Sequence, residues 1–281
     1  MSVKQGAIRL RAAREADMPR LKTLWQETFG EDHIGAHLFE TCFVPDQVQS
    51  SLVLLEDDVI RSMAFFLPTF WYDTEKGYAP APCLVGLATD RTRRHRKYAS
   101  WLVETACDFM VEKGAGGVWT LLKDDALELF FSMQGFWTLP RGERQTVSAR
   151  ELPNGAEIRR EQPAEYDRVR ERLLHSCNHV VAGPVVTAWQ RELAERGGGG
   201  MFLVRCSGEE ACVLATVRGG TAYIHEVLCS EEQRPAVLGA VAQELGTAQC
   251  VAQPPLGMLR LMNRFAEMER PEGYLGCGIM I

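Results

Sequence analysis

The stretch "LVGLATDRTRRHRKYASWLVETA", residues 84–106, carries most of the information about how this chain folds. A mostly apolar segment that ends at Thr89 predicts a β-strand, and apolar residues at helical spacing predict a helix that begins at Tyr98 or Ala99. Between them lies a run of arginine, lysine and histidine side chains. Because the first N–H groups of a helix have no partner inside it, a basic loop at this place favours an anion such as phosphate or pyrophosphate.

The composition limits the class of protein. The chain has 281 residues, 46% of them hydrophobic, a formal net charge of −6 and a sequence pI of about 5.6. This length is sufficient for two hydrophobic cores, which predicts a soluble two-domain protein. Broad nucleic-acid binding usually needs a basic domain, and here the basic run is an island in an acidic chain. We therefore expect no nucleic-acid partner.

Cysteine usage and hydropathy predict the compartment. The nine cysteines form no CxxC pair, and we expect no metal site. We interpret them as reduced core residues, because the surroundings of Cys42, Cys83, Cys107, Cys250 and Cys277 are apolar. No segment reaches about 18 uninterrupted apolar residues, so we expect a cytoplasmic protein with no membrane partner.

Residues 1–142 have the pattern of a mixed α/β domain. A short strand at 8–11 precedes a helix between Asp17, a predicted N-cap, and Gly30, a predicted stop. Strands follow at 51–73 and 82–89, then the helix behind the basic loop, and then the segments "GVWTLL", "DALELFFSMQ" and "GFWTL". The expected buried face of the helix behind the basic loop consists of Tyr98, Trp101, Leu102, Ala106, Phe109 and Met110.

The rest of the chain repeats this order. Residues 143–156 are polar and contain proline and glycine, which predicts a linker. Residues 157–281 again show strand, helix, hairpin, helix and strand, so we predict a duplicated fold with a degenerate second copy. The glycines at 197–200 follow a helix and precede a strand, the reverse of a phosphate loop, and predict a turn.

The basic loop resembles the Arg/Gln-x-x-Gly-x-Gly/Ala loop of the GCN5-related N-acetyltransferases, the GNAT superfamily. Arg94 falls at the first position, Lys97 at the middle glycine and Ala99 at the last. The segments at 8–30 and 126–139 also resemble the family's first strand and helix and its helix followed by Gly-Phe. The resemblance implies a GNAT fold in tandem, in which only the first copy binds acetyl-CoA.

The resemblance also implies which residues bind the co-substrate. The backbone of the strand would pair with the pantetheine arm, and the loop and the start of the helix would surround the pyrophosphate. The basic side chains at 91 and 93, and that of Arg96, would either reach the CoA 3′-phosphate or face water, and both alternatives are open. The implied cofactor-binding residues are Leu87, Ala88, Thr89, Arg94, His95, Arg96, Lys97, Tyr98 and Ala99.

The sequence departs from the family at two places. His95 and Lys97 stand where glycines let the backbone approach phosphate, so Lys97 either obstructs the pyrophosphate or supplies charge to it. Phe131 occupies the position of a tyrosine that in many GNAT enzymes protonates the departing thiolate, and phenylalanine carries no proton for this. Either another group donates, or the thiolate leaves unaided, or transferase activity is lost. The alternative groups considered are Ser132, His225, Glu226, Tyr98 and the terminal carboxylate of Ile281.

The acceptor is less well indicated. Glu27, Glu31, Asp32 and His33 lie where the family often lines its acceptor pocket, and acidic groups would suit an amine; a solvated helix end explains the same charges. The sequence thus predicts an acetyl-CoA-dependent N-acetyltransferase acting on a small amine by direct attack. The alternative is a CoA-binding or ligand-sensing pseudoenzyme, and no oligomeric state is predicted.

Overall fold

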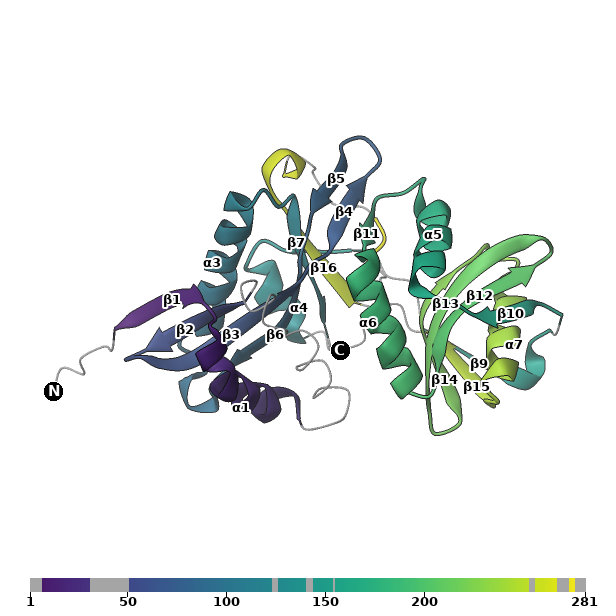
Figure 1. Ribbon diagram of the computed structural model, residues 1–281, viewed down its shortest axis with the longest axis horizontal. Helices are drawn as coiled ribbons and strands as arrows, with labels where there is room; N and C mark the ends of the chain where they lie inside the picture. The colour runs from purple at the N-terminus through teal and green to yellow at the C-terminus, as the bar shows by residue number, and fades with distance from the viewer. Residues whose placement is uncertain are drawn as a thin grey trace.

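Two large mixed sheets, each covered by helices on both faces, make up the protein (Figure 1). The computed structural model describes residues 7–30, 51–122, 126–139, 144–153, 155–252, 256–266 and 273–275. Among these residues no helix is both long and apolar enough to cross a membrane. The candidate positions Cys42, Glu31, Asp32, His33, Cys277 and Ile281 lie outside the described residues.

The first sheet has seven strands in the order β1-β2-β3-β6-β7-β16-β8. Along β2, Leu52 and Leu54 face α3, while Val53 and Leu55 face α1, because successive side chains of a strand point to opposite faces. The sheet is therefore buried on both sides. The elements are β1 (Ile8–Ala12), α1 (Met18–Phe29), β2 (Leu52–Glu56), β3 (Val59–Leu67), β6 (Cys83–Thr89), α3 (Tyr98–Glu112), β7 (Gly117–Leu122), α4 (Ala126–Ser132), β8 (Trp137–Thr138) and β16 (Leu256–Leu261).

Helix α3 confirms the predicted start at Tyr98 and most of the predicted buried face. Trp101 is the exception: it is 38% exposed and stacks on the Tyr98 ring instead of entering the core. Helix α1 begins after Asp17 and ends at Gly30 as predicted. The Asp17 carboxylate does not cap this helix, however, because it binds the Arg11 guanidinium at 2.6 and 2.9 Å.

The second sheet has six strands in the order β10-β12-β13-β14-β15-β9. Helix α7 packs on one face, and α5 and α6 pack on the other (Figure 1). The predicted copy of the first half is present, since the order of strands and helices from β10 to β15 repeats that from β1 to β7. The elements are β9 (Gln145–Ser148), β10 (Glu157–Arg160), α5 (Pro163–Leu174), α6 (Gly183–Arg196), β12 (Gly200–Cys206), β13 (Glu209–Arg218), β14 (Thr221–Leu228), α7 (Arg234–Glu244) and β15 (Gln249–Ala252).

The two halves exchange a strand. β9, which lies in the predicted linker 143–156, pairs with β15 of the second sheet. β16, which lies in the predicted second domain 157–281, runs between β7 and β8 of the first sheet. The domain boundaries at 142 and 157 stay a prediction. Strand pairing places residues 145–148 in the second sheet and residues 256–261 in the first sheet. The sequence did not indicate that β9 would pair with β15 or that β16 would pair with β7, because the partners are far apart along the chain.

A small third sheet and a shared core join the halves. β11 (His179–Val181) of the second half pairs with β4 (Phe70–Asp73), which pairs with β5 (Gly77–Pro80), both of the first half. One cluster of buried side chains contains Trp25 and Trp71 together with Tyr166 and Trp189. The strands predicted from "SMAFFLPTFWY" belong to this core and to the α3 side of the sheet.

Two smaller predictions are confirmed, the first of them in part. Of the described cysteines, Cys83, Cys107, Cys212 and Cys250 are free and buried as expected, whereas Cys177, Cys206 and Cys229 are free and only half-buried, so the prediction of core residues holds for part of the set. The glycines at 197–200 turn from α6 into β12. A Cβ at Gly199 would lie 1.9 Å from the Ala215 carbonyl oxygen, so backbone packing accounts for that glycine.

Candidate functional site

The candidate site begins where β6 and β7 separate. These parallel strands are paired at one register position, Cys83 with Trp119, and beyond it β3 is the only strand beside β6 in the part of the chain that the structure describes. The Thr120 hydroxyl donates a 2.9 Å hydrogen bond to the Leu84 carbonyl as the strands diverge. The edge at residues 87–89 can therefore accept an extended partner in the manner of an added strand.

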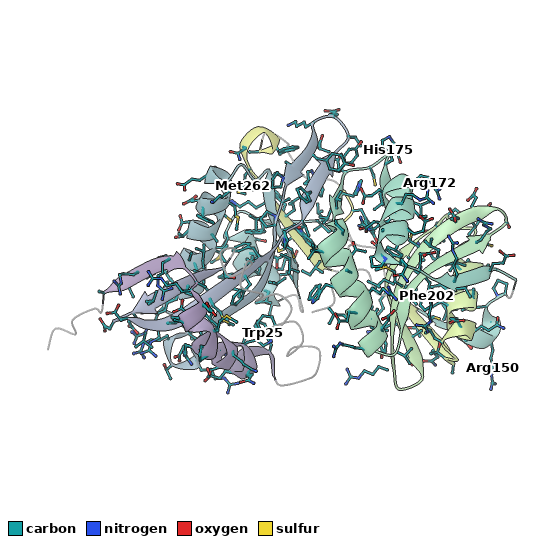
Figure 2. The ribbon with its side chains drawn as sticks, in the orientation of Figure 1. Trp25, Arg150, Arg172, His175, Phe202 and Met262 are labelled. Atoms are coloured by element: carbon teal, nitrogen blue, oxygen red, sulfur yellow. The ribbon has the colours of Figure 1, made fainter. Side chains whose placement is uncertain are left out.

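A bulge at Gly86 shapes this edge. The register between β3 and β6 shifts at Met63 and Phe65, because β6 carries one more residue there than β3. Gly86 has a φ of +60°, and a Cβ on it would lie 2.5 Å from Trp25 Cζ3 and 2.8 Å from Phe65 Cδ2. Trp25 projects from α1 beneath the sheet (Figure 2). Both the backbone conformation and the available space therefore require glycine.

The basic loop keeps the backbone shape that glycines would give it. His95 has a φ of +63° and Lys97 a φ of +65°, both in the left-handed region. Each side chain held in that region costs roughly 1–2 kcal/mol. Both side chains are exposed. The departure from the family pattern thus changes the residue types and leaves the handedness of the backbone in place.

Helix α3 presents its N-terminus to this loop. Lys97 is the N-cap residue, no side chain caps the helix, and its first turn contains no acidic residue. The first-turn N–H groups and the partial positive charge of the helix end favour an anion here. Arg94 lies alongside, exposed, with its Nε 3.5 Å from the Thr89 carbonyl oxygen.

Glu56, at the end of β2, lies beneath the loop. It is 7% exposed and accepts hydrogen bonds from Arg93, from Arg96 at 3.4 Å and from the Tyr98 hydroxyl at 2.9 Å. The Arg93 hydrogen bond is the largest influence on the Glu56 pKa and lowers it, although burial acts in the opposite direction. Burial is the main cause that raises the pKa of Tyr98. Glu56 is therefore a carboxylate and Tyr98 its protonated donor.

Asp90 fixes the first turn of the loop. Its Oδ1 accepts hydrogen bonds from the Thr92 N–H at 2.9 Å and the Thr92 hydroxyl at 2.7 Å, and its Oδ2 lies 2.8 Å from Arg20 and 3.1 Å from Arg61. Burial raises the Asp90 pKa, but the Thr92 and Arg61 hydrogen bonds and the Arg20 charge outweigh burial and lower the pKa to about 2. A second carboxylate thus ties the loop to α1 and β3.

The basic run divides into inward and outward side chains. Two arginines lie on Glu56, and Arg91 donates to the Glu27 carbonyl at 2.6 Å. Arg93 is half-buried on Glu56, whereas Arg91 and Arg96 are exposed while they make these contacts, so both alternatives, 3′-phosphate and water, stay open. Arg94 and Lys97 form no ion pair within the described part of the chain. The structure brings them to the start of α3, beside the β6 edge.

Phe131 is a core residue. It is 4% exposed, and its ring packs edge-on against Phe130 and Phe136 at centroid distances of 5.0 and 5.3 Å. As the sequence implies, Phe131 cannot act as an acid, and the structure places its ring among other aromatic rings. Ser132, next in α4, is exposed, and Tyr98 is engaged with Glu56.

The two candidate acid or base residues in the second half, His225 and Glu226, form hydrogen bonds within that half. His225 Nε2 lies 2.8 Å from the Thr216 hydroxyl, and burial lowers the pKa of His225 to about 4. The Glu226 carboxylate accepts a 2.8 Å hydrogen bond from Tyr166 and a 3.1 Å hydrogen bond from Arg170, and both ionic side chains are almost fully buried. Neither residue is presented to the β6 edge as a base.

A titratable group beside this network gives a test of the packing. Burial raises the pKa of Asp167 to about 6, although a 2.7 Å hydrogen bond from Thr187 lowers it. Because the folded state holds this proton more tightly than the unfolded state, stability decreases as pH rises from about 4 through 6, by about 1–3 kcal/mol. We expect Asp167→Asn to be more stable than wild type at pH 7, with the gain disappearing near pH 4 in urea denaturation. A gain of equal size at both pH values would contradict this account.

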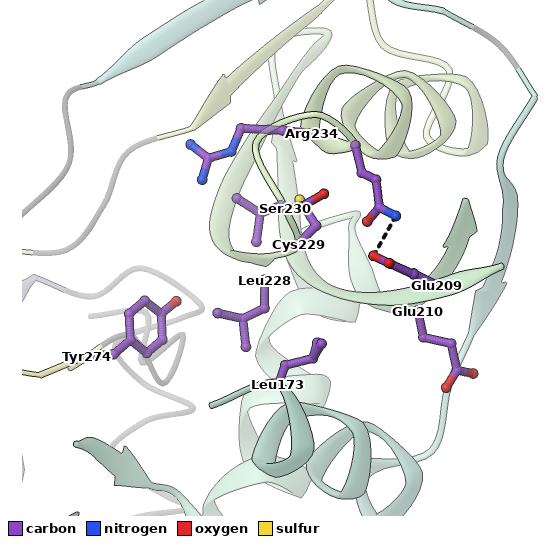
Figure 3. Close-up of a pocket in the computed structure, with 10 residues that line it drawn as sticks. Leu173, Glu209, Glu210, Leu228, Cys229, Ser230, Arg234 and Tyr274 are labelled. Carbon is purple, nitrogen blue, oxygen red and sulfur yellow. Dashed lines mark hydrogen bonds between the residues drawn. The ribbon is translucent and has the colours of Figure 1, made fainter. Parts of the chain in front are cut away.

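The second copy has a cavity where the first has the basic loop. β14 pairs with β15 only up to Ile224, and a cavity of about 370 Å³ lies at the far end of β14 (Figure 3). Leu228 and Tyr274 give it apolar walls, and Glu209 and Arg234 lie on its rim. Arg234 is paired with Glu231 at 2.9 Å. These neighbouring carboxylates give this end of β14 a more acidic surrounding than the basic loop gives the end of β6.

Glu56, Asp90 and Gly86 were missed by sequence reasoning. Glu56 looked like part of the acidic turn in "LLEDDV", and its partners follow it by some forty residues, as with the Tyr98 hydrogen bond at a separation of 42. Gly86 gave a possible signal, since an isolated glycine inside a strand pattern often marks a bulge.

Comparison with known proteins identifies the fold. No protein-family model matches the chain, and no curated protein matches it. A GCN5-related N-acetyltransferase from Kribbella flavida superposes with a TM-score of 0.70 at 15% identity, over 93% of this chain and 72% of the other. One from Anabaena variabilis gives 0.69 at 8% identity over 92% and 73%, and one from Sphaerobacter thermophilus gives 0.53 at 13% over 96% and 98%. The chain therefore has the fold of the GCN5-related N-acetyltransferases, in two copies joined in tandem.

Proposed function

We propose that the first half binds acetyl-CoA and that the protein transfers the acetyl group to a small amine. The observation that carries the proposal is the left-handed backbone at His95 and Lys97, in front of an uncapped α3. Left-handed residues in a loop allow successive N–H groups to form an anion-binding concavity, and Arg94 and Lys97 in the same loop would add positive charge. A diphosphate fits such a site because backbone N–H groups, a helix N-terminus and cations all favour it.

The β6 edge is the second feature that suits acetyl-CoA. Within the described residues, 87–89 have no strand on the β7 side, so their N–H and C=O groups suit the amide groups of a pantetheine arm. Acetyl-CoA would supply the thioester carbonyl at the end of that arm. The N–H groups of this edge would then stabilise negative charge on the carbonyl oxygen as an amine attacks.

The chemistry must proceed without an acid at Phe131. Attack of a neutral amine forms the amide N–C bond and breaks the C–S bond, so the thiolate takes its proton from water and the amine loses one to solvent. In this mechanism the protein acts by holding both reactants in place, which is the larger part of many acyl-transfer accelerations.

A thermal-shift titration tests the proposal. A ligand that binds only the folded state raises its stability by about 2.7 kcal/mol at 100 times its Kd, which corresponds to a rise of several degrees in Tm. We expect CoA and acetyl-CoA each to raise Tm in this way. No shift at millimolar CoA would refute binding. Where binding is found, release of CoA thiol in the presence of a panel of amines measures transfer.

A CoA-dependent sensor is the second candidate, and Phe131 is the observation that favours it. Such a protein would show the same rise in Tm but no amine-dependent release of thiol. Phe131→Tyr separates the two further, because a hydroxyl at this position would accelerate transfer only in a site that already aligns both reactants.

A further inference from the structure

Glu56 is held more rigidly than an ordinary surface carboxylate. It pairs with Ile8 of β1 on one side and with Val59 of β3 on the other, so its backbone is fixed within the sheet. The turn that follows uses Asp57 and Asp58 in left-handed conformations, with φ values of +50° and +65°. The carboxylate is thereby placed at a defined point under the basic loop.

Both carboxylate oxygens are occupied by the loop. Oε2 accepts the Arg93 hydrogen bond, and Oε1 accepts those of Arg96 and the Tyr98 hydroxyl. Removing one partner from such a buried group leaves a charge uncompensated, so the arginines are not readily drawn away from it. The Arg93 guanidinium consequently points back towards the sheet, and Arg96, whose side chain is 56% exposed, is held at the surface by its contact with Glu56.

We propose that Glu56 is a positioning residue that sets donor specificity: it retains Arg93 and Arg96, so that the loop recognises the diphosphate of a CoA-type donor and not its 3′-phosphate. The proposal rests on the acetyl-CoA binding proposed above. The cations left for the ligand are Arg94 and Lys97, which lie beside the first-turn N–H groups of α3. These groups match a diphosphate, which CoA and 3′-dephospho-CoA share.

Isothermal titration calorimetry with CoA and 3′-dephospho-CoA tests the proposal. We expect wild-type protein to bind the two with Kd values that differ by less than about fivefold, since long-range attraction alone favours the extra phosphate. In Glu56→Gln the neutral amide forms no ion pair with Arg93, with Arg96 or with Arg61, whose Nε lies 3.5 Å from Glu56 Oε2. The preference for CoA should then rise by about fivefold or more, as expected for a freed charge near a dianion.

Two further variants control for charge and for folding. Asp58→Asn removes one negative charge nearby from an exposed, left-handed position that asparagine tolerates, and it should leave the ratio of the two Kd values unchanged. Arg93→Gln tests the same idea without removing the carboxylate, and we expect it to change both Kd values by the same factor.

The outcomes separate this proposal from the one it rests on. Absence of binding by either ligand to wild type refutes the proposed function and this inference with it. Binding of CoA with a wild-type preference above about fivefold overturns the inference and leaves the proposed function standing. An unchanged ratio in Glu56→Gln, or a loss confined to CoA in Arg93→Gln, overturns it as well.

Discussion

Gly86→Ala should lower the free energy of unfolding by about 2–5 kcal/mol. The φ of +60° disfavours any side chain, and the new Cβ would lie 2.5 Å from the Trp25 ring and 2.8 Å from the Phe65 ring. Neither ring can retreat easily, because both are almost fully buried. Urea denaturation followed by tryptophan fluorescence measures the change.

Gly77→Ala is the matched control. Gly77 also has a positive φ, +74°, but no atom lies within 4 Å of the position of its Cβ. We expect this variant to lose only about 1–2 kcal/mol, the contribution of the backbone conformation. Equal losses in the two variants would show that the contact with Trp25 and Phe65 does not constrain β6.

Arg94→Glu should weaken CoA binding by about 30-fold to 100-fold, as expected from loss of a charge-assisted hydrogen bond together with a reversed charge. Arg94 is exposed and pairs with no carboxylate within the described residues, so its replacement should leave the fold intact. The remaining backbone N–H groups account for whatever affinity persists. Calorimetric titration with CoA, with the melting temperature of the free variant as a check of folding, gives the result.

Arg91→Glu applies the same charge change a few residues away. Arg91 donates to the Glu27 carbonyl and points away from the start of α3 in our assignment, so we expect CoA affinity to fall by less than about fivefold. If the two variants weaken binding equally, the loop attracts the ligand only through its overall charge. If Arg94→Glu has no effect, the diphosphate has been placed wrongly.

The loop was predictable because its information is local. The strand that ends at Thr89, the start of α3 at Tyr98 and the positions of Arg94 and Lys97 all follow from consecutive residues. The left-handed conformation at His95 and Lys97 was indicated only by the resemblance, which places them at glycine positions, since such a conformation is uncommon for any residue but glycine. Glu56 and Asp90 hold the chain on both sides of these residues, through hydrogen bonds that join the loop to distant parts of the sequence.

The sheets were less predictable than their strands. β6, β7, β12 and β14 follow from composition and alternation, but nothing local indicates that β16 leaves its own half. Strand pairing depends on backbone hydrogen bonds that any sequence can form, so partners distant in sequence leave little trace in residue types. The inward pairing of Arg93 was hidden for a similar reason, since its partner lies on another strand.

The exchanged strands determine when during synthesis each sheet can be completed. The sheet that carries the basic loop is completed by β16, which is translated only after the whole second half. Until then the edge of β7 is uncovered, and an uncovered edge invites aggregation. A chain ending after residue 142 would lack that strand, and the second half alone would lack β9. The seven-stranded sheet can therefore be completed only after the second half, which precedes β16 in the chain, has been made.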